Sequence, residues 1–244
     1  MRALLSARQQ PGTIFVPMHW TDQFAARARV DTLVPALTDP HSGQPASKHV
    51  PASIGRFAAA KYGFAVLTER PNALASEYWA LAKCEGGWRL ELAFADDDRD
   101  WLAFATSLFD TAPGAETLSF HDGAAGRHRF ACFDGDRLGG ALFLASEPVA
   151  VSRDWACEQL LKKHAGQRAR MAVIAGRPGF GVVDRGATVC SCFGVGAKQI
   201  ETAIAGGCRS VEAVGEALQA GTNCGSCRGE ILTIIDEHRV QAAE

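Results

Sequence analysis

Four cysteines near the end of the chain constrain its fold more than any other feature. Cys190 and Cys192 form a CxC pair, Cys224 and Cys227 form a CxxC pair, and 31 residues separate the two pairs. Thiolates bind zinc and iron well, and two chelating pairs supply four ligands once the chain folds back on itself. The spacing therefore indicates an inorganic centre rather than disulfides. From spacing alone, a structural zinc ion and an iron–sulfur cluster stay equally open.

Length, composition and charge set broad limits. The 244 residues are 47% hydrophobic and 21% charged, with a formal net charge of −2, so a folded globular protein is expected. This balance gives no electrostatic case for nucleic acid or an anionic membrane surface, and no apolar run reaches the roughly 18 residues of a membrane span. The other four cysteines are scattered and are expected to be core residues, which favours a reducing cytoplasm. They are Cys84, Cys132, Cys157 and Cys208.

The chain divides into three parts, and the fold class expected for the whole is α+β. Residues 1–56 hold six prolines and read as an irregular piece of a β-rich domain. Residues 57–180 alternate helical and strand patterns and predict a small α+β domain. Residues 188–244 predict a compact unit of three helices, one of them capped by Ser210, after a linker rich in glycine. The start, MRALLSARQQPG, lacks the apolar core of a secretory signal and reads as a start inside a domain.

Local patterns predict the elements of the middle domain. Apolar spacing predicts a helix over 71–85 that stops at Gly86-Gly87, and a second helix after the acidic run that starts at Asp96. Alternation predicts a strand from Trp88 to Phe94, and Ser152 is expected to open a helix that runs to Gly166. Three further strands are predicted over 116–121, 127–133 and 137–145, with a hairpin turn at Asp134-Gly135.

Context around the four cysteines favours a cluster. Helices are expected to begin just after Cys192 and near Cys227, so that unpaired N–H groups at their N-termini point at the centre. Gly194, Gly196 and Gly225 are expected to let the backbone approach the sulfurs closely. Such donors stabilise a centre whose negative charge grows on reduction.

At these residues the chain resembles a known family. The run CSCFGVGAKQIETAIAGG, followed by SVEAVGEAL and AGTNCGSCRGEI, resembles the 2Fe-2S domain of the bacterioferritin-associated ferredoxin type. That domain occurs alone and inside assimilatory nitrite and nitrate reductases. The resemblance implies that Cys190, Cys192, Cys224 and Cys227 are the four ligands of a 2Fe-2S cluster.

A second resemblance lies at the other end. The segment GTIFVPMHWTDQFAARARVDTLVPALTDPHSGQPASKH is similar to the end of the molybdopterin-dinucleotide-binding domain of assimilatory nitrate reductase. It implies that Lys48, His19 and Trp20 approach molybdopterin guanine dinucleotide in the full-length enzyme. Asp31 stands where related enzymes usually have asparagine, and a carboxylate would repel phosphate, so a cofactor contact is not expected there.

Together the two resemblances imply a nitrate reductase catalytic subunit without its larger N-terminal part. The family's molybdenum ligand and 4Fe-4S site have no counterpart in this sequence. The expected role is to accept single electrons from a reductase, ferredoxin or flavodoxin and to pass them toward molybdenum, where the full-length family reduces nitrate to nitrite. Two alternatives stay open: a zinc-binding docking module, and a gene remnant whose first segment folds poorly.

Overall fold

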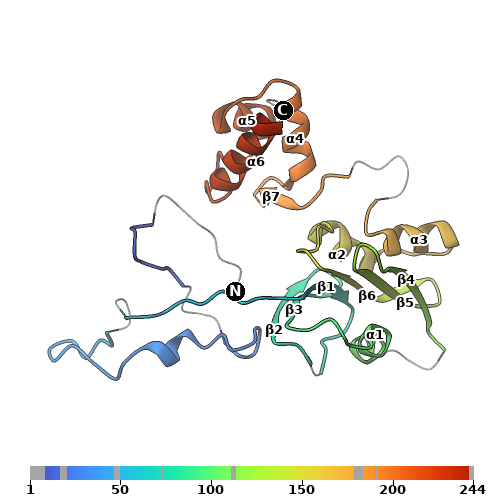
Figure 1. Cartoon of the computed structure of the whole chain (residues 1–244), viewed down its shortest axis with the longest axis horizontal. Helices are drawn as coiled ribbons and strands as arrows, with labels where there is room; N and C mark the ends of the chain where they lie inside the picture. The colour runs from blue at the N-terminus through green and yellow to red at the C-terminus, as the bar shows by residue number, and fades with distance from the viewer. Residues whose placement is uncertain are drawn as a thin grey trace.

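The structure is a computed structural model, and it describes residues 9–16, 21–46, 50–72, 74–110, 114–178, 184–190 and 192–241. Within these residues the chain is α+β, with a six-stranded sheet, a small two-stranded sheet and six α-helices. Figure 1 shows the sheet and its helices, a separate helical unit at the C-terminal end, and an extended N-terminal segment. None of the helices in the described part of the chain is long and apolar enough to cross a membrane.

The large sheet has the strand order β2-β3-β1-β6-β5-β4, and neighbouring strands are antiparallel. The central strand β1 pairs with β3 on one side and β6 on the other, and its side chains are mostly buried because apolar clusters lie on both faces of the sheet. The strands are β1 (Lys61–Leu67), β2 (Tyr78–Cys84), β3 (Gly87–Phe94), β4 (Glu116–Asp122), β5 (Arg127–Asp134) and β6 (Arg137–Ala145). The four strands predicted at 88–94 and over 116–145 are confirmed.

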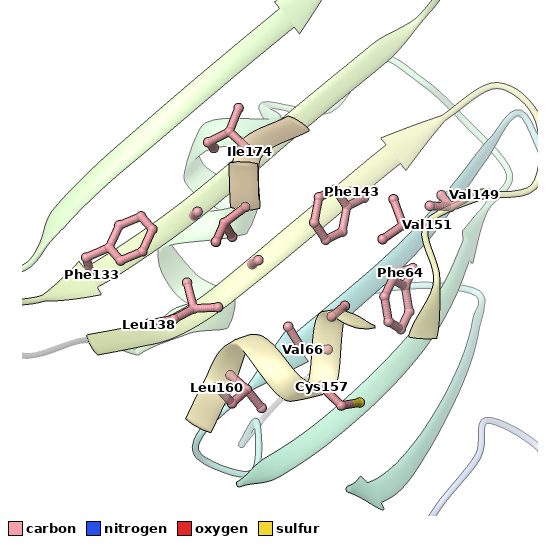
Figure 2. Close-up of a cluster of buried hydrophobic side chains, with 14 residues drawn as sticks. Phe64, Val66, Phe133, Leu138, Phe143, Val149, Val151, Cys157, Leu160 and Ile174 are labelled. Carbon is pink, nitrogen blue, oxygen red and sulfur yellow. The ribbon is translucent and has the colours of Figure 1, made fainter. Parts of the chain in front are cut away.

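Helices cover both faces of the sheet. On one face α1 (Trp101–Phe109) packs over a core that includes Phe94 and Phe130. On the other face α2 (Arg153–Leu161) and α3 (Gln167–Ala175) pack over the cluster of Figure 2. The labelled members of that cluster are Phe64, Val66, Phe133, Leu138, Phe143, Val149, Val151, Cys157, Leu160 and Ile174.

The helix predicted over 71–85 was wrong. Residues 78–84 form β2, which pairs with β3 along its whole length through a tight turn at Glu85 and Gly86. Gly86 has φ +82°, a backbone angle that suits a turn and would strain most other residues. Apolar spacing alone does not separate helix from strand over so short a run, and the ladder hydrogen bonds of a sheet decide the outcome.

The helix opened by Ser152 is shorter than predicted. Ser152 caps α2 by accepting a hydrogen bond from the Trp155 N–H at 3.4 Å, as expected. However, α2 ends at Leu161, because the chain then turns to pair with the β5–β6 hairpin. His164 N donates to Asp136 O at 2.6 Å, and the predicted end of the helix, Gly166, instead precedes α3.

The N-terminal segment lies along the free edge of β2. Ala26 N donates to Trp79 O at 2.9 Å and Leu81 N donates to Phe24 O at 2.7 Å, which extends the ladder by one bridge. The Arg70 Nη2 group donates to Gln23 O at 2.8 Å. The described part of residues 9–60 otherwise contains a 3-10 turn, η1 (Val30–Leu33), and one isolated bridge. Residues 24–26 thus pair with backbone groups in the middle of β2 that this edge would otherwise leave unpaired.

The aspartates of the acidic run before α1 have different roles. Asp100 is the N-cap, and its carboxylate accepts from Leu102 N at 3.0 Å and Ala103 N at 2.9 Å. Asp97 lies 2.7 Å from the fully buried Lys61 Nζ. Asp98 is exposed. Capping and pairing, rather than the helix dipole alone, therefore explain this run.

We expect Asp100→Ala to lower the free energy of unfolding by about 1 kcal/mol, because it leaves two N–H groups of α1 without their acceptor. Asp98→Ala removes the same charge from the same run without removing a cap, and should change it by less than about 0.5 kcal/mol. Urea unfolding of the intact chain, followed by tryptophan fluorescence, measures both. Equal effects of the two variants would contradict the capping role.

Candidate metal centre

The C-terminal unit consists of a short hairpin and three helices that share one core. Its elements are β7 (Thr188–Cys190), β8 (Val195–Gly196), α4 (Ala197–Ala205), α5 (Val211–Leu218) and α6 (Arg228–Gln241). The three helices predicted here are confirmed, including the Ser210 cap, whose hydroxyl accepts from Ala213 N at 3.1 Å. Ile200, Val214, Ile231 and Ile235 are fully buried between them. This apolar core fixes the two loops that carry the cysteines.

The first cysteine loop is the β7–β8 hairpin. Cys190 ends β7 and is 2% exposed, whereas Cys192 lies in the turn and is exposed. A Cβ atom on Gly196 would lie 2.0 Å from the Arg185 carbonyl oxygen, so only glycine lets the incoming chain pass. A Cβ atom on Gly194 would also have Arg185 as its neighbour, with Nη1 at 3.7 Å, and the expectation that Gly194 and Gly196 admit backbone to the sulfurs stays a prediction.

The second cysteine loop leads directly into α6. Gly225, between Cys224 and Cys227, has φ +72°. This left-handed residue turns the chain so that Arg228 N donates to Gly225 O at 3.2 Å and the helix can start. The expected helix N-terminus beside Cys227 is confirmed. The one expected just after Cys192 is wrong, since β8 intervenes and α4 starts at Ala197.

The structure places the four thiols in two pairs, and each pair contains one thiol from each loop. Cys192 Sγ lies 3.4 Å from Cys224 Sγ. Cys190 and Cys227 form a second hydrogen-bonded pair, and both are buried. Two thiolates on one tetrahedral metal ion at 2.3 Å would lie about 3.8 Å apart, so the exposed pair is close to a chelating separation.

Backbone N–H groups surround these sulfurs. Those of Gly221, Phe193 and Cys192 donate to the Cys190 sulfur, and that of Ser226 donates to the Cys224 sulfur. Such donors stabilise thiolate charge and, in an iron–sulfur site, the charge of the cluster. They arise in the turns themselves more than at helix ends.

The thiols of the site differ in pKa. Hydrogen bonds from the Ser226 hydroxyl and backbone, and from Cys192, lower the pKa of Cys224 to about 7. Burial raises the pKa of Cys227, and its bond with Cys190 raises it further. The pKa of Cys190 is lowered, although burial opposes this, because several backbone donors face its sulfur. Thiolate forms in this site thus depend on donors supplied by the fold.

The donor set suits a 2Fe-2S cluster. Such a cluster has two iron atoms, and four cysteine thiolates complete their coordination. The two thiol pairs, each with one thiol from each loop, provide four ligands grouped two by two, as two iron atoms require. Among the described side chains, no set of three or more histidine, cysteine, aspartate or glutamate residues converges on one metal-ion position.

Of the residues predicted to contact a pterin cofactor, His19, Trp20 and Lys48 lie outside the described residues. Asp31, for which no contact was expected, lies 3.2 Å from Arg29 Nη2 in an exposed ion pair. Cys208 is half-buried in the core of the helical unit, with its sulfur 3.6 Å from Ala213 O, in keeping with its predicted apolar role.

Two residues of the site were missed by sequence reasoning. The Ser226 hydroxyl lies 3.3 Å from the Cys224 sulfur, and Gly221 N–H faces the buried pair. A serine between the two cysteines of a CxxC motif was the available signal for the first. The second depends on a turn whose direction no local pattern specifies.

Comparison with protein families agrees with this geometry. Residues 188–237 match the BFD-like [2Fe-2S] binding domain, and residues 1–51 match the molybdopterin dinucleotide binding domain. The chain therefore carries both types of cofactor-binding domain, which confirms the two cofactors that the sequence implied.

Two proteins illustrate the relationship. The chain is 37% identical to the nitrate reductase of Klebsiella oxytoca over 235 residues, which is 96% of this chain and 26% of that protein. It is also 40% identical over 65 residues to the nitrogen fixation protein NifU of Leptolyngbya boryana, covering 25% of this chain and 32% of NifU. The resemblance to nitrate reductase is thus confirmed along nearly the whole chain, although the chain spans about a quarter of that relative's length.

We expect Gly225→Ala to impair formation of the site. A Cβ atom at φ +72° costs about 1 kcal/mol or more and would move Cys224 relative to Cys227. Gly229→Ala is the matched control, because its Cβ would meet nothing within 4 Å and it lies inside α6. After anaerobic reconstitution, iron content per chain should fall in the first variant only. Equal iron content in both would contradict a geometric role for Gly225.

Proposed function

We propose that this chain is the electron-transfer segment of an assimilatory nitrate reductase, which in its complete form reduces nitrate to nitrite. The observation that carries this proposal is the arrangement of the four thiols in two pairs. Each pair links two loops that are 31 residues apart, within a segment that matches a [2Fe-2S] binding family. The match of residues 1–51 to a molybdopterin dinucleotide binding domain supplies the second cofactor class that such an enzyme needs.

In this proposal Cys190, Cys192, Cys224 and Cys227 hold the cluster. When bound, a 2Fe-2S cluster takes up and releases one electron at a time. The protein stabilises the charge of the site and holds it in place. The backbone donors of the two turns stabilise the sulfur charge, and the buried pair anchors the site to the apolar core of the unit.

The exposed thiol pair gives the site a side that a partner can reach. Cys192 and Cys224 are exposed, and the adjacent Phe193 is 41% exposed on the same turn. A large apolar side chain at the surface beside a redox site is a suitable anchor for a transient partner. We propose that an electron-donating reductase, ferredoxin or flavodoxin docks here.

The other parts of the proposal concern the pterin side. We propose that His19, Trp20 and Lys48 contact molybdopterin guanine dinucleotide in the complete enzyme and that residues 1–56, 57–180 and 188–244 are its successive domains in this chain. The contact of residues 24–26 with β2 supports a close association of the first two. A cytoplasmic location is proposed because the four cysteines outside the site, two buried and two half-buried, carry no disulfide.

Replacing each proposed ligand singly with serine should reduce the iron and acid-labile sulfide bound after anaerobic purification, since serine oxygen is a poorer ligand for iron. The unmodified chain is expected to hold about two of each per molecule. Cys208→Ser, which changes a cysteine of the same unit outside the site, should retain both. A colourless chain that binds one zinc ion instead would support the docking-module alternative and overturn the assignment.

The donor surface can be tested with reduced ferredoxin or flavodoxin mixed anaerobically with the iron-loaded chain. The visible absorbance should bleach, and Phe193→Ser should slow this about threefold or more, because an apolar anchor of the partner contact is lost. Reduction by dithionite, a small molecule, should be unchanged. Leu232→Ser is the control, since Leu232 is an exposed apolar residue of α6. Equal slowing by both variants would argue against docking at Phe193.

A further inference from the structure

A hollow lies on the large sheet, far along the chain from the four site cysteines. The hollow lies on the face of the sheet that α3 covers, just beyond the end of that helix. There the last residues of β4 and the first residues of β5 are not covered by α3. Its volume is about 400 Å³, within the usual range of small-molecule sites. The lining residues that matter are Phe120, Asp122, Arg127, Arg129, Met171 and Arg177.

The sheet register sets these side chains side by side. Phe120 is directly opposite Arg129, and Asp122 is directly opposite Arg127. Residues two apart on a strand share a face, so all four belong to the face that α3 covers further along. The Arg129 guanidinium lies 5.9 Å from the centre of the Phe120 ring.

The end of α3 positions two of the three arginines, and it holds the side chain of Arg129. Arg129 Nη1 donates to Ile174 O at 3.1 Å and to Ala175 O at 2.5 Å, which are among the unpaired carbonyls at the C-terminus of the helix. Gly176, with φ +65°, ends the helix and delivers Arg177 to the same hollow. Arg129 is therefore held in place before any ligand binds.

The site has more positive charge than its own residues neutralise. Three guanidinium groups and one carboxylate line the hollow, and none of the three guanidinium groups is in an ion pair with any residue in the described ranges. A second carboxylate, that of Asp184, lies near enough to Arg177 for the arginine to lower its pKa, which still leaves an excess of positive charge. Asp122 uses one carboxylate oxygen to accept from Ala125 N at 3.0 Å. Burial is the main cause that lowers the pKa of Arg129, and repulsion from Arg127 and Arg177 lowers it further.

We propose that this hollow binds a small phosphate monoester that carries a ring, of the nucleoside monophosphate class. A phosphate dianion matches the uncompensated charge, and guanidinium groups bind phosphate oxygens in a forked geometry. Phe120 and Met171 are 44% and 49% exposed at the same site, so they offer an apolar surface for the ring. This site is independent of the thiols and of the proposed electron transfer.

The test is isothermal titration of the intact chain with AMP, adenosine and inorganic phosphate. We expect saturable 1:1 binding of AMP that weakens with added salt, and at least about tenfold weaker binding of adenosine, which lacks the charge. Arg127→Gln combined with Arg177→Gln should weaken AMP binding by about tenfold or more. Neither side chain forms an ion pair or a side-chain hydrogen bond with a described residue, so circular dichroism of this variant should match that of the original chain.

Controls separate a built site from general charge attraction. Arg168→Gln removes an exposed charge from α3 outside the hollow and should leave AMP binding unchanged. Phe120→Leu should weaken AMP but not inorganic phosphate. Equal AMP affinity in the double variant and the original chain would overturn the proposal. So would a poly-glutamate peptide that binds as tightly as AMP and is indifferent to Phe120, since the arginines would then serve an acidic protein partner.

Discussion

Burial of three helix faces against one another is the constraint on which the candidate metal centre depends. The two cysteine pairs are separated by 31 residues, and neither loop forms a site alone. Ile200, Ile231 and Ile235 are fully buried at the junction of α4 and α6, and each contributes about 1.5–3 kcal/mol relative to exposure. That burial offsets the entropy of bringing the loops together, so the thiols meet because the helices pack.

The same packing makes the site asymmetric. Cys190 and Cys227 face the apolar core, and Cys192 and Cys224 face solvent. A buried sulfur is costly to ionise unless donors face it, and the turn N–H groups supply them. One side of the centre is therefore anchored and insulated, and the other can be reached by another protein. An electron-transfer role needs both properties in a small unit.

Sequence reasoning succeeded where the determinants were local. Ser152 and Ser210 mark helix starts, Asp134-Gly135 marks a hairpin, and the cysteine spacing marks a site, because caps, turns and chelation depend on few neighbouring residues. It failed where partners were distant. Residues 78–84 became a strand because β3 pairs with them, and the arginine hollow depends on a strand register together with the end of α3. Neither partner is visible in a local pattern.

The first turn of α2 shows how the middle domain and the thiol-bearing unit are joined. Arg153 points to the sheet, where Nε and Nη2 each lie 2.8 Å from an oxygen of Glu91, and its guanidinium lies 4.3 Å from the Phe64 ring centre. The next residue, Asp154, accepts from the Thr188 hydroxyl at 2.6 Å, two residues before Cys190. The first contact is partly buried and bidentate, whereas the second is exposed and is worth about 1 kcal/mol. The sheet thus holds α2 firmly, while α2 holds the thiol-bearing unit only lightly. This difference suits the proposed exchange of electrons with a separate protein.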